Sequence, residues 1–187
     1  MTSPSSTTIA EAQRDMHRAY FSGAPGMLTS AAVWFTAGLV ALLVSSERAL
    51  WTLLIGAAFI HPVSVLVLKL LGRSGQHAKG NALGSLAFAT TVWLILSCVI
   101  AYGVSLYRME WFFPAMLLVI GGRYLTFATL FGMQVYWVCG LALALAGYVL
   151  ILLHAAPAAG AFTGAAVEAS FAVAIFILSR RQGVRAL

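Results

Sequence analysis

Six apolar segments, each close to twenty residues long, follow one another along most of the chain. They are joined by short connections and span about 27–45, 49–71, 83–105, 110–132, 134–153 and 159–179. A helix that crosses the roughly 30 Å hydrocarbon core of a bilayer needs about 20 such residues. Backbone polar groups must be paired inside lipid, and the segments lack the alternation of barrel strands, so each segment is predicted to be helical. The pattern predicts an all-α, polytopic membrane protein of six transmembrane helices arranged as repeated helical hairpins.

A polar N-terminal arm, residues 1–26, precedes these segments. Thr8 and Glu11 have the spacing of a capping box, which predicts a short helix that ends near Phe21. We expect this helix to lie at the level of the lipid headgroups. Residues 27–179 are predicted to form the transmembrane bundle, and 180–187 a basic tail.

The basic residues predict an orientation for the bundle in the membrane. The chain is 61% hydrophobic and 9% charged, with a net charge of +6, which in a soluble protein would suggest a nucleic-acid partner. Here most basic side chains lie in the arm, one loop and the tail, so we expect no nucleic acid. Lys and Arg are enriched on the cytoplasmic side of membrane proteins. The bias predicts that both termini are cytoplasmic in the inner membrane, with basic side chains near anionic lipid headgroups. The residues on that side are Arg14, Arg18, Lys69, Arg73, Lys79, Arg180, Arg181 and Arg185, and those on the other are Arg48 and Arg108.

An internal repeat appears when the chain is shifted by 60 residues. Trp51 and Ile60 then fall on Trp111 and Ile120, and flanking Val-Ser, Arg and Gly residues also coincide. Two helices separate the copies, so they have the same orientation across the membrane. Helices 5 and 6 resemble a diverged third copy, which predicts three helical hairpins.

Three ionisable residues lie near the midpoints of the second helices of these hairpins. They are His61, Arg123 and Glu168. A charge inside hydrocarbon costs about 3 kcal/mol or more, so each needs a partner, water or a functional reason. With the neighbouring polar side chains, they form the predicted substrate-binding set: His61, Ser64, Arg123, Tyr124, Thr126 and Glu168.

Two interpretations of this set remain open. In one, Arg123 and Glu168 form a buried ion pair that serves assembly, with His61 hydrogen-bonded beside them. In the other, the three residues face a central cavity, where Arg123 binds an anionic or polar group while Glu168 and His61 exchange protons. The first interpretation describes a structural or envelope-stress membrane protein, and the second a small-solute or ion transporter or channel.

Other kinds of chemistry have little support in the sequence. The glycine-rich loop between helices 2 and 3 has Asn81 where a phosphate-binding loop needs Lys followed by Ser or Thr. His154 has no second ligand at metal-binding spacing, and no Ser-His-Asp or paired-carboxylate arrangement is present. We therefore expect no enzyme activity, no cofactor and no metal.

Two stretches are similar to a known group of sequences. With SLYRMEWFFPAMLLVIGGRYLTFATLFGM and KLLGRSGQHAKGN, the chain resembles a family of small bacterial integral membrane proteins of unassigned function, over nearly its whole length. That resemblance implies the membrane fold but brings no site residues. In architecture alone, the chain is similar to HdeD-like acid-resistance membrane proteins, which makes an envelope-stress role an alternative.

The predicted membrane architecture implies several partners. They are the lipid bilayer, anionic headgroups and a small polar or anionic solute. Faces rich in glycine and alanine also predict self-association as a homo-oligomer. The leading functional hypothesis is a small-solute or ion transporter with a polar site at the membrane midplane.

Overall fold

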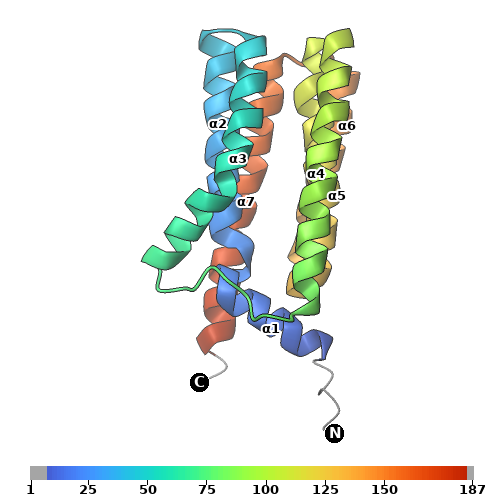
Figure 1. The fold of residues 1–187 in the computed structure, drawn as a ribbon. Helices are drawn as coiled ribbons and strands as arrows, with labels where there is room; N and C mark the ends of the chain where they lie inside the picture. Colours follow the sequence, from blue (N-terminus) through green and yellow to red (C-terminus); the bar gives the residue numbers. More distant parts are fainter. Residues whose placement is uncertain (1–7, 185–187) are drawn as a thin grey trace, which may run out of the picture.

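The computed structural model describes residues 8–184, and these residues are helical apart from their connections (Figure 1). Residues 1–7 of the predicted arm and 185–187 of the predicted tail lie outside the described residues. The elements are α1 (Ile9–Tyr20), η1 (Phe21–Gly23), α2 (Ala24–Leu43), α3 (Ser46–Leu70), α4 (Ala82–Tyr107), η2 (Met109–Trp111), α5 (Phe112–Phe131), α6 (Val135–Leu152) and α7 (Pro157–Val184).

Six of the helical segments in the described range are long and apolar enough to cross a membrane. They correspond to the six apolar runs of the sequence, so the prediction of six long, apolar helices is confirmed. Their ends differ from the predicted ends by a few residues, as for the last helix, which extends to Val184.

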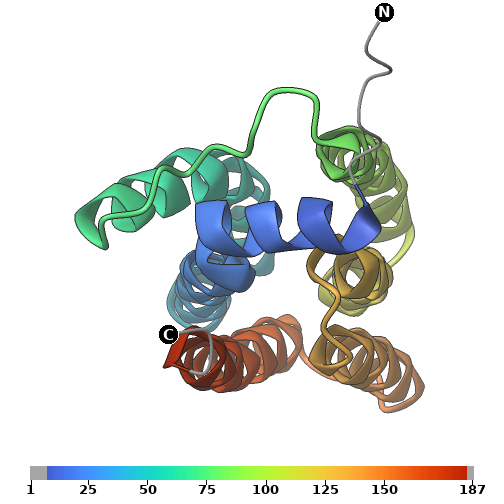
Figure 2. The same ribbon diagram turned by 90° about the horizontal axis from the view of Figure 1, so that it is seen from below.

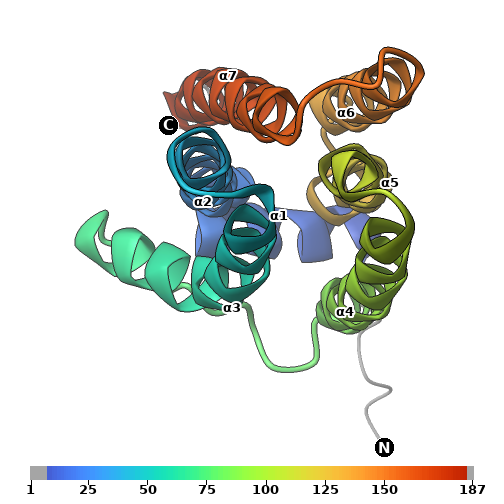
Figure 3. The ribbon, with the colours of Figure 1, turned by 90° about the horizontal axis from the view of Figure 1, so that it is seen from above.

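The long helices form two groups of three, seen from above in Figure 3. One group contains α3, α2 and α7, and the other contains α4, α5 and α6. The most extensive contacts join α2 to α7 and α5 to α6, while α6 and α7 contact each other less. α7 therefore packs mainly on α2 and not on α6, its predicted hairpin partner. The 60-residue repeat stays a prediction.

Glycines bring α5 and α6 into direct backbone contact. A Cβ atom built on Gly121 would lie 2.6 Å from the carbonyl oxygen of Gly140, and one on Gly140 would lie 2.6 Å from that of Gly121. No larger residue fits at either position without separating the helices. This contact fixes the rotation of α5, and with it the directions of Arg123 and Tyr124.

The amphipathic helix α1 crosses the end of the bundle (Figure 2). The predicted capping box is present: Glu11 N–H donates to Thr8 Oγ1, and Thr8 N–H donates to Glu11 Oε2. The Asn81 amide donates to Asp15 Oδ2 at 2.7 Å, and this hydrogen bond lowers the pKa of Asp15 below its ordinary value. α1 is thus attached to the loop between α3 and α4, and both lie at the same end of the bundle as the end of α7 (Figure 1).

Candidate functional site

Glu168 is the most enclosed charged residue of the described chain. It lies on α7, its side chain is 0% exposed, and among the residues that the structure describes no Lys, Arg or His nitrogen lies within 4.0 Å of its carboxyl oxygens. Tyr124 of α5, also buried, donates its hydroxyl hydrogen to Glu168 Oε1 at 2.9 Å. The second oxygen, Oε2, is buried and has no hydrogen-bond partner. A carboxylate in such surroundings is costly, so this enclosed position favours a bound proton or an additional ligand.

Two residues of α2 complete the surroundings of this carboxyl group. Ser30 is buried and faces Glu168. Trp34 lies one turn further along α2, packs against α7 at Gly164, and has a buried indole N–H without a partner. An unpaired donor and an unpaired acceptor therefore both belong to the seam between α2 and α7. Such groups are the usual partners of buried water.

Arg123 has different surroundings, although it precedes Tyr124 on α5. Its Nη2 donates to Thr91 Oγ1 of α4 at 3.2 Å, and its Cζ atom lies 5.2 Å from the centre of the Phe127 ring. The residue is partly exposed, but its Nε is buried and has no partner. The guanidinium is thus supported on one side and retains donors for an anion.

The predicted ion pair between Arg123 and Glu168 is absent from the structure. Within residues 8–180, the ion pair closer than 4.0 Å is Arg108–Glu110, at an end of the bundle. Successive residues on a helix point about 100° apart, so Tyr124 can face α7 only if Arg123 faces elsewhere. The assembly interpretation in its ion-pair form is therefore wrong, and Tyr124 is the direct partner of Glu168.

The structure shows no hydrogen bond from the other three candidate residues to the side chain of Glu168 or Arg123 within the described part of the chain. His61 is exposed on α3, and its carbonyl accepts a hydrogen bond from Ser64 Oγ at 2.8 Å. Thr126 Oγ1 donates to the Arg123 carbonyl at 2.7 Å. Pro62 interrupts the backbone bonding of α3, and the second half of that helix turns away from the bundle (Figure 1). His61 therefore belongs to the bend of α3.

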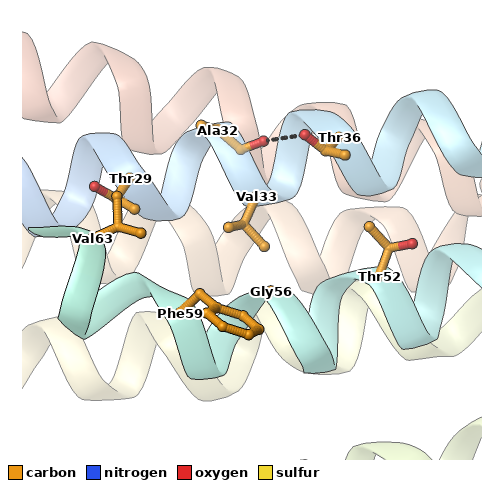
Figure 4. Close-up of a pocket in the computed structure, with 8 residues that line it drawn as sticks. All are labelled: Thr29, Ala32, Val33, Thr36, Thr52, Gly56, Phe59 and Val63. Atoms are coloured by element: carbon orange, nitrogen blue, oxygen red, sulfur yellow. Dashed lines mark hydrogen bonds between the residues drawn. The ribbon is translucent and has the colours of Figure 1, made fainter.

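A groove of about 270 Å³ lies between α2 and α3 (Figure 4). Its lining contains three threonines whose hydroxyls donate to carbonyls of their own helices, which leaves the groove largely apolar. None of the six candidate residues lines it. The residues that do are Thr29, Ala32, Val33, Thr36, Thr52, Gly56, Phe59 and Val63.

Sequence reasoning missed Ser30, Trp34 and Thr91. The first two lie four residues apart, which places them on one face of a helix. That spacing was the available signal, but it does not say which helix the face meets. Thr91 is one of many hydroxyl residues in apolar runs, and nothing in the sequence singles it out as the partner of Arg123.

A model of a family of unknown function (DUF7010) matches residues 9–178 of the chain. The chain belongs to this family. The matched range begins at the first residue of α1 and ends within α7, so it includes Glu168, Tyr124, Arg123 and Thr91. Membership confirms the resemblance to an uncharacterised family. No curated protein and no solved structure matches the chain.

Proposed function

We propose that this member of the family is a small-solute or ion transporter of the bacterial inner membrane, with Glu168 as its proton-carrying group. Both termini are cytoplasmic in this proposal, because α1, the loop after α3 and the end of α7 lie at one end of the bundle (Figure 1) and all three segments carry Lys or Arg. The transported solute is small and polar or anionic.

The observation that carries the proposal is the half-satisfied carboxyl group of Glu168. One oxygen accepts from Tyr124 and the other has no partner, at a position enclosed by α2, α5 and α7. Ionisable residues within membrane spans are rare and mark ion or proton pathways. If packing alone were required, an apolar side chain would fill this place at lower cost.

Arg123 supplies the second element of the proposed transport site. Tyr124, its neighbour on α5, links that helix to α7, while Arg123 has an unpaired Nε and lies against α4. A movement of α5 relative to α7 that breaks the Tyr124–Glu168 bond therefore also moves the Arg123 guanidinium. This coupling relates proton exchange at Glu168 to anion binding at Arg123.

Proton uptake into liposomes tests the proposal. Vesicles that contain the purified protein and an internal pH dye receive a potassium diffusion potential, with chloride, sulfate or alanine outside. We expect wild-type vesicles to acidify faster than empty ones, and Glu168→Gln vesicles to behave like empty ones. Glu47→Gln changes an exposed carboxyl group at the start of α3 and serves as the matched control. Equal uptake by wild type and Glu168→Gln in every condition would refute proton carriage by Glu168.

A structural role is the second candidate function, and the hydrogen bond between Tyr124 and Glu168 favours it. The Tyr124–Glu168 bond directly joins α5 to α7, and Glu168 is 0% exposed in this conformation. On this alternative, the envelope-stress role would rest on a stable bundle and not on flux. Glu168→Gln would then lower stability without changing proton uptake relative to empty vesicles.

A further inference from the structure

Two arginines at the α1 end of the bundle rest on a pair of packed aromatic rings. The Arg73 Cζ atom lies 5.4 Å from the centre of the Phe21 ring, and the Arg180 Cζ atom lies 4.5 Å from the centre of the Phe176 ring. The two rings pack against each other with their centres 5.1 Å apart. Three distant segments thereby meet: the loop after α3, the bend between α1 and α2, and the end of α7.

The backbone at this junction is held in an unusual conformation. Phe21, Ser22 and Gly23 have positive φ angles of 50°, 56° and 82°, which reverse the chain between α1 and α2. Ser179 donates its hydroxyl hydrogen to Ser22 Oγ at 2.6 Å, and His17 Nδ1 lies 2.6 Å from the same oxygen. Non-glycine residues at positive φ are strained, and the surrounding bonds hold them in place.

The positions of both arginines follow from this junction. Arg180 comes directly after Ser179, so the bond between Ser179 and Ser22 fixes the end of α7 beside Phe21. Arg73 lies in a turn that is attached to α1, because the Gly75 N–H donates to the Ala19 carbonyl at 3.1 Å. The two guanidinium groups are therefore presented by a fixed scaffold.

Both guanidinium groups are available to a ligand. Arg73 and Arg180 are exposed, and within the described part of the chain no carboxylate lies within 4.0 Å of either. A guanidinium stacked on a ring uses its face and keeps its edge N–H groups free for planar, paired hydrogen bonds. Phosphate oxygens accept such bonds well. Arg108, at the other end, also stacks on a ring, that of Trp111, but its Nη1 is already paired with Glu110 at 3.1 Å.

We infer that Arg73 and Arg180, on the Phe21–Phe176 pair, form a binding site for a phosphate-bearing anion. The site is separate from the proposed transport site and does not depend on it. Its ligand has two sources that share this chemistry, an anionic lipid headgroup and a soluble phosphate.

Thermal unfolding of the full chain in neutral detergent tests the inference and separates the two sources. Short-chain phosphatidylglycerol, short-chain phosphatidylcholine and inorganic phosphate are each titrated while the unfolding temperature is recorded. We expect a saturable stabilisation by phosphatidylglycerol that exceeds that by phosphatidylcholine. If inorganic phosphate alone gives the same saturable stabilisation, the ligand is a soluble phosphate, and if it gives none, the ligand is the lipid headgroup.

The variants decide whether the stabilisation comes from this site. Replacing Arg73 and Arg180 together by Gln should weaken the apparent affinity about tenfold or more, because two charge-assisted contacts are lost. The matched control is the double variant Lys69→Gln and Lys79→Gln, which removes two exposed charges from the same end. This control should retain the wild-type affinity within about threefold, because the cations that stack on Phe21 and Phe176 are Arg73 and Arg180 and not these lysines.

Two further variants keep the charge and change only the geometry. Replacing both arginines by Lys, or Phe176 by Leu, should weaken binding several-fold while net charge stays constant. Wild-type affinity in the double Gln variant would overturn the inference. So would an equal loss in the lysine control, because diffuse charge would then account for binding.

Discussion

Glu168 and Arg123 are both ionisable residues inside the same bundle, yet their surroundings differ. Glu168 is 0% exposed, bonds to a tyrosine and, within the described residues, has no Lys, Arg or His nitrogen closer than 4.0 Å. Arg123 is partly exposed, bonds to a threonine and stacks on an aromatic ring. A simple ion pair would have neutralised both residues. Keeping them apart leaves one unpaired atom on each, which is the arrangement that a proton or a ligand can complete.

Disrupting the contact between α5 and α6 should lower the free energy of unfolding most, because this contact orients Arg123 and Tyr124 on α5. In Gly140→Val, the new side chain meets the Gly121 carbonyl oxygen and separates the helices. We expect a loss of about 3 kcal/mol in the free energy of unfolding, measured in mixed detergent micelles. Gly103→Val, on α4, where a Cβ atom meets nothing within 4 Å, is the control. Equal losses in both variants would mean that the close contact between α5 and α6 does not orient α5.

Loss of the Tyr124–Glu168 hydrogen bond should have the second-largest effect on the free energy of unfolding. Tyr124→Phe removes the hydroxyl that donates to Glu168 Oε1, so a fully buried carboxyl group loses this hydrogen bond. We expect a loss of about 1–3 kcal/mol in the free energy of unfolding. Tyr148→Phe removes a hydroxyl from an exposed tyrosine of α6 and should change the free energy of unfolding by less than about 0.5 kcal/mol. A Tyr124→Phe variant as stable as wild type would show that Glu168 gains nothing from the hydroxyl.

Arg123→Gln should lower the free energy of unfolding less, by about 1 kcal/mol, because Arg123 is partly exposed and has one neutral hydrogen-bond partner. Its combination with Glu168→Gln should be nearly additive. Tyr124→Phe combined with Glu168→Gln should instead show an interaction energy of about 1 kcal/mol, because these residues are in direct contact. The reverse order of the two interaction energies would restore the ion-pair interpretation.

Thr91→Val should have the smallest effect, about 0.5 kcal/mol, because it removes one acceptor from Arg123. Thr163→Val is the control, since that exposed hydroxyl donates to the Ala159 carbonyl of its own helix. If the control loses as much stability as Thr91→Val, the Arg123–Thr91 bond contributes nothing measurable.

Glu168 and Arg123 also illustrate which features of the bundle could be predicted from the sequence. Apolar segment length predicted the six long helices, and the capping box of Thr8 and Glu11 predicted α1, because both signals are local. Rotation of each helix is decided by packing, such as the close approach of Gly121 to Gly140. For that reason Glu168, Arg123 and Tyr124 were predicted as site residues, but the contacts of Tyr124 with Glu168 and of Thr91 with Arg123 were not. It also grouped His61 with them, although that residue is exposed on α3.

In the proposed transporter, Glu168 holds a proton and exchanges it. Infrared spectroscopy of the protein in lipid, recorded across a pH titration as wild type minus Glu168→Gln, tests this most directly. We expect a band of a buried, protonated carboxyl group that the variant lacks and that loses intensity reversibly as pH rises. A band of constant intensity over the whole pH range in which the protein stays folded would contradict the claim, because Glu168 would then be a fixed part of the packing.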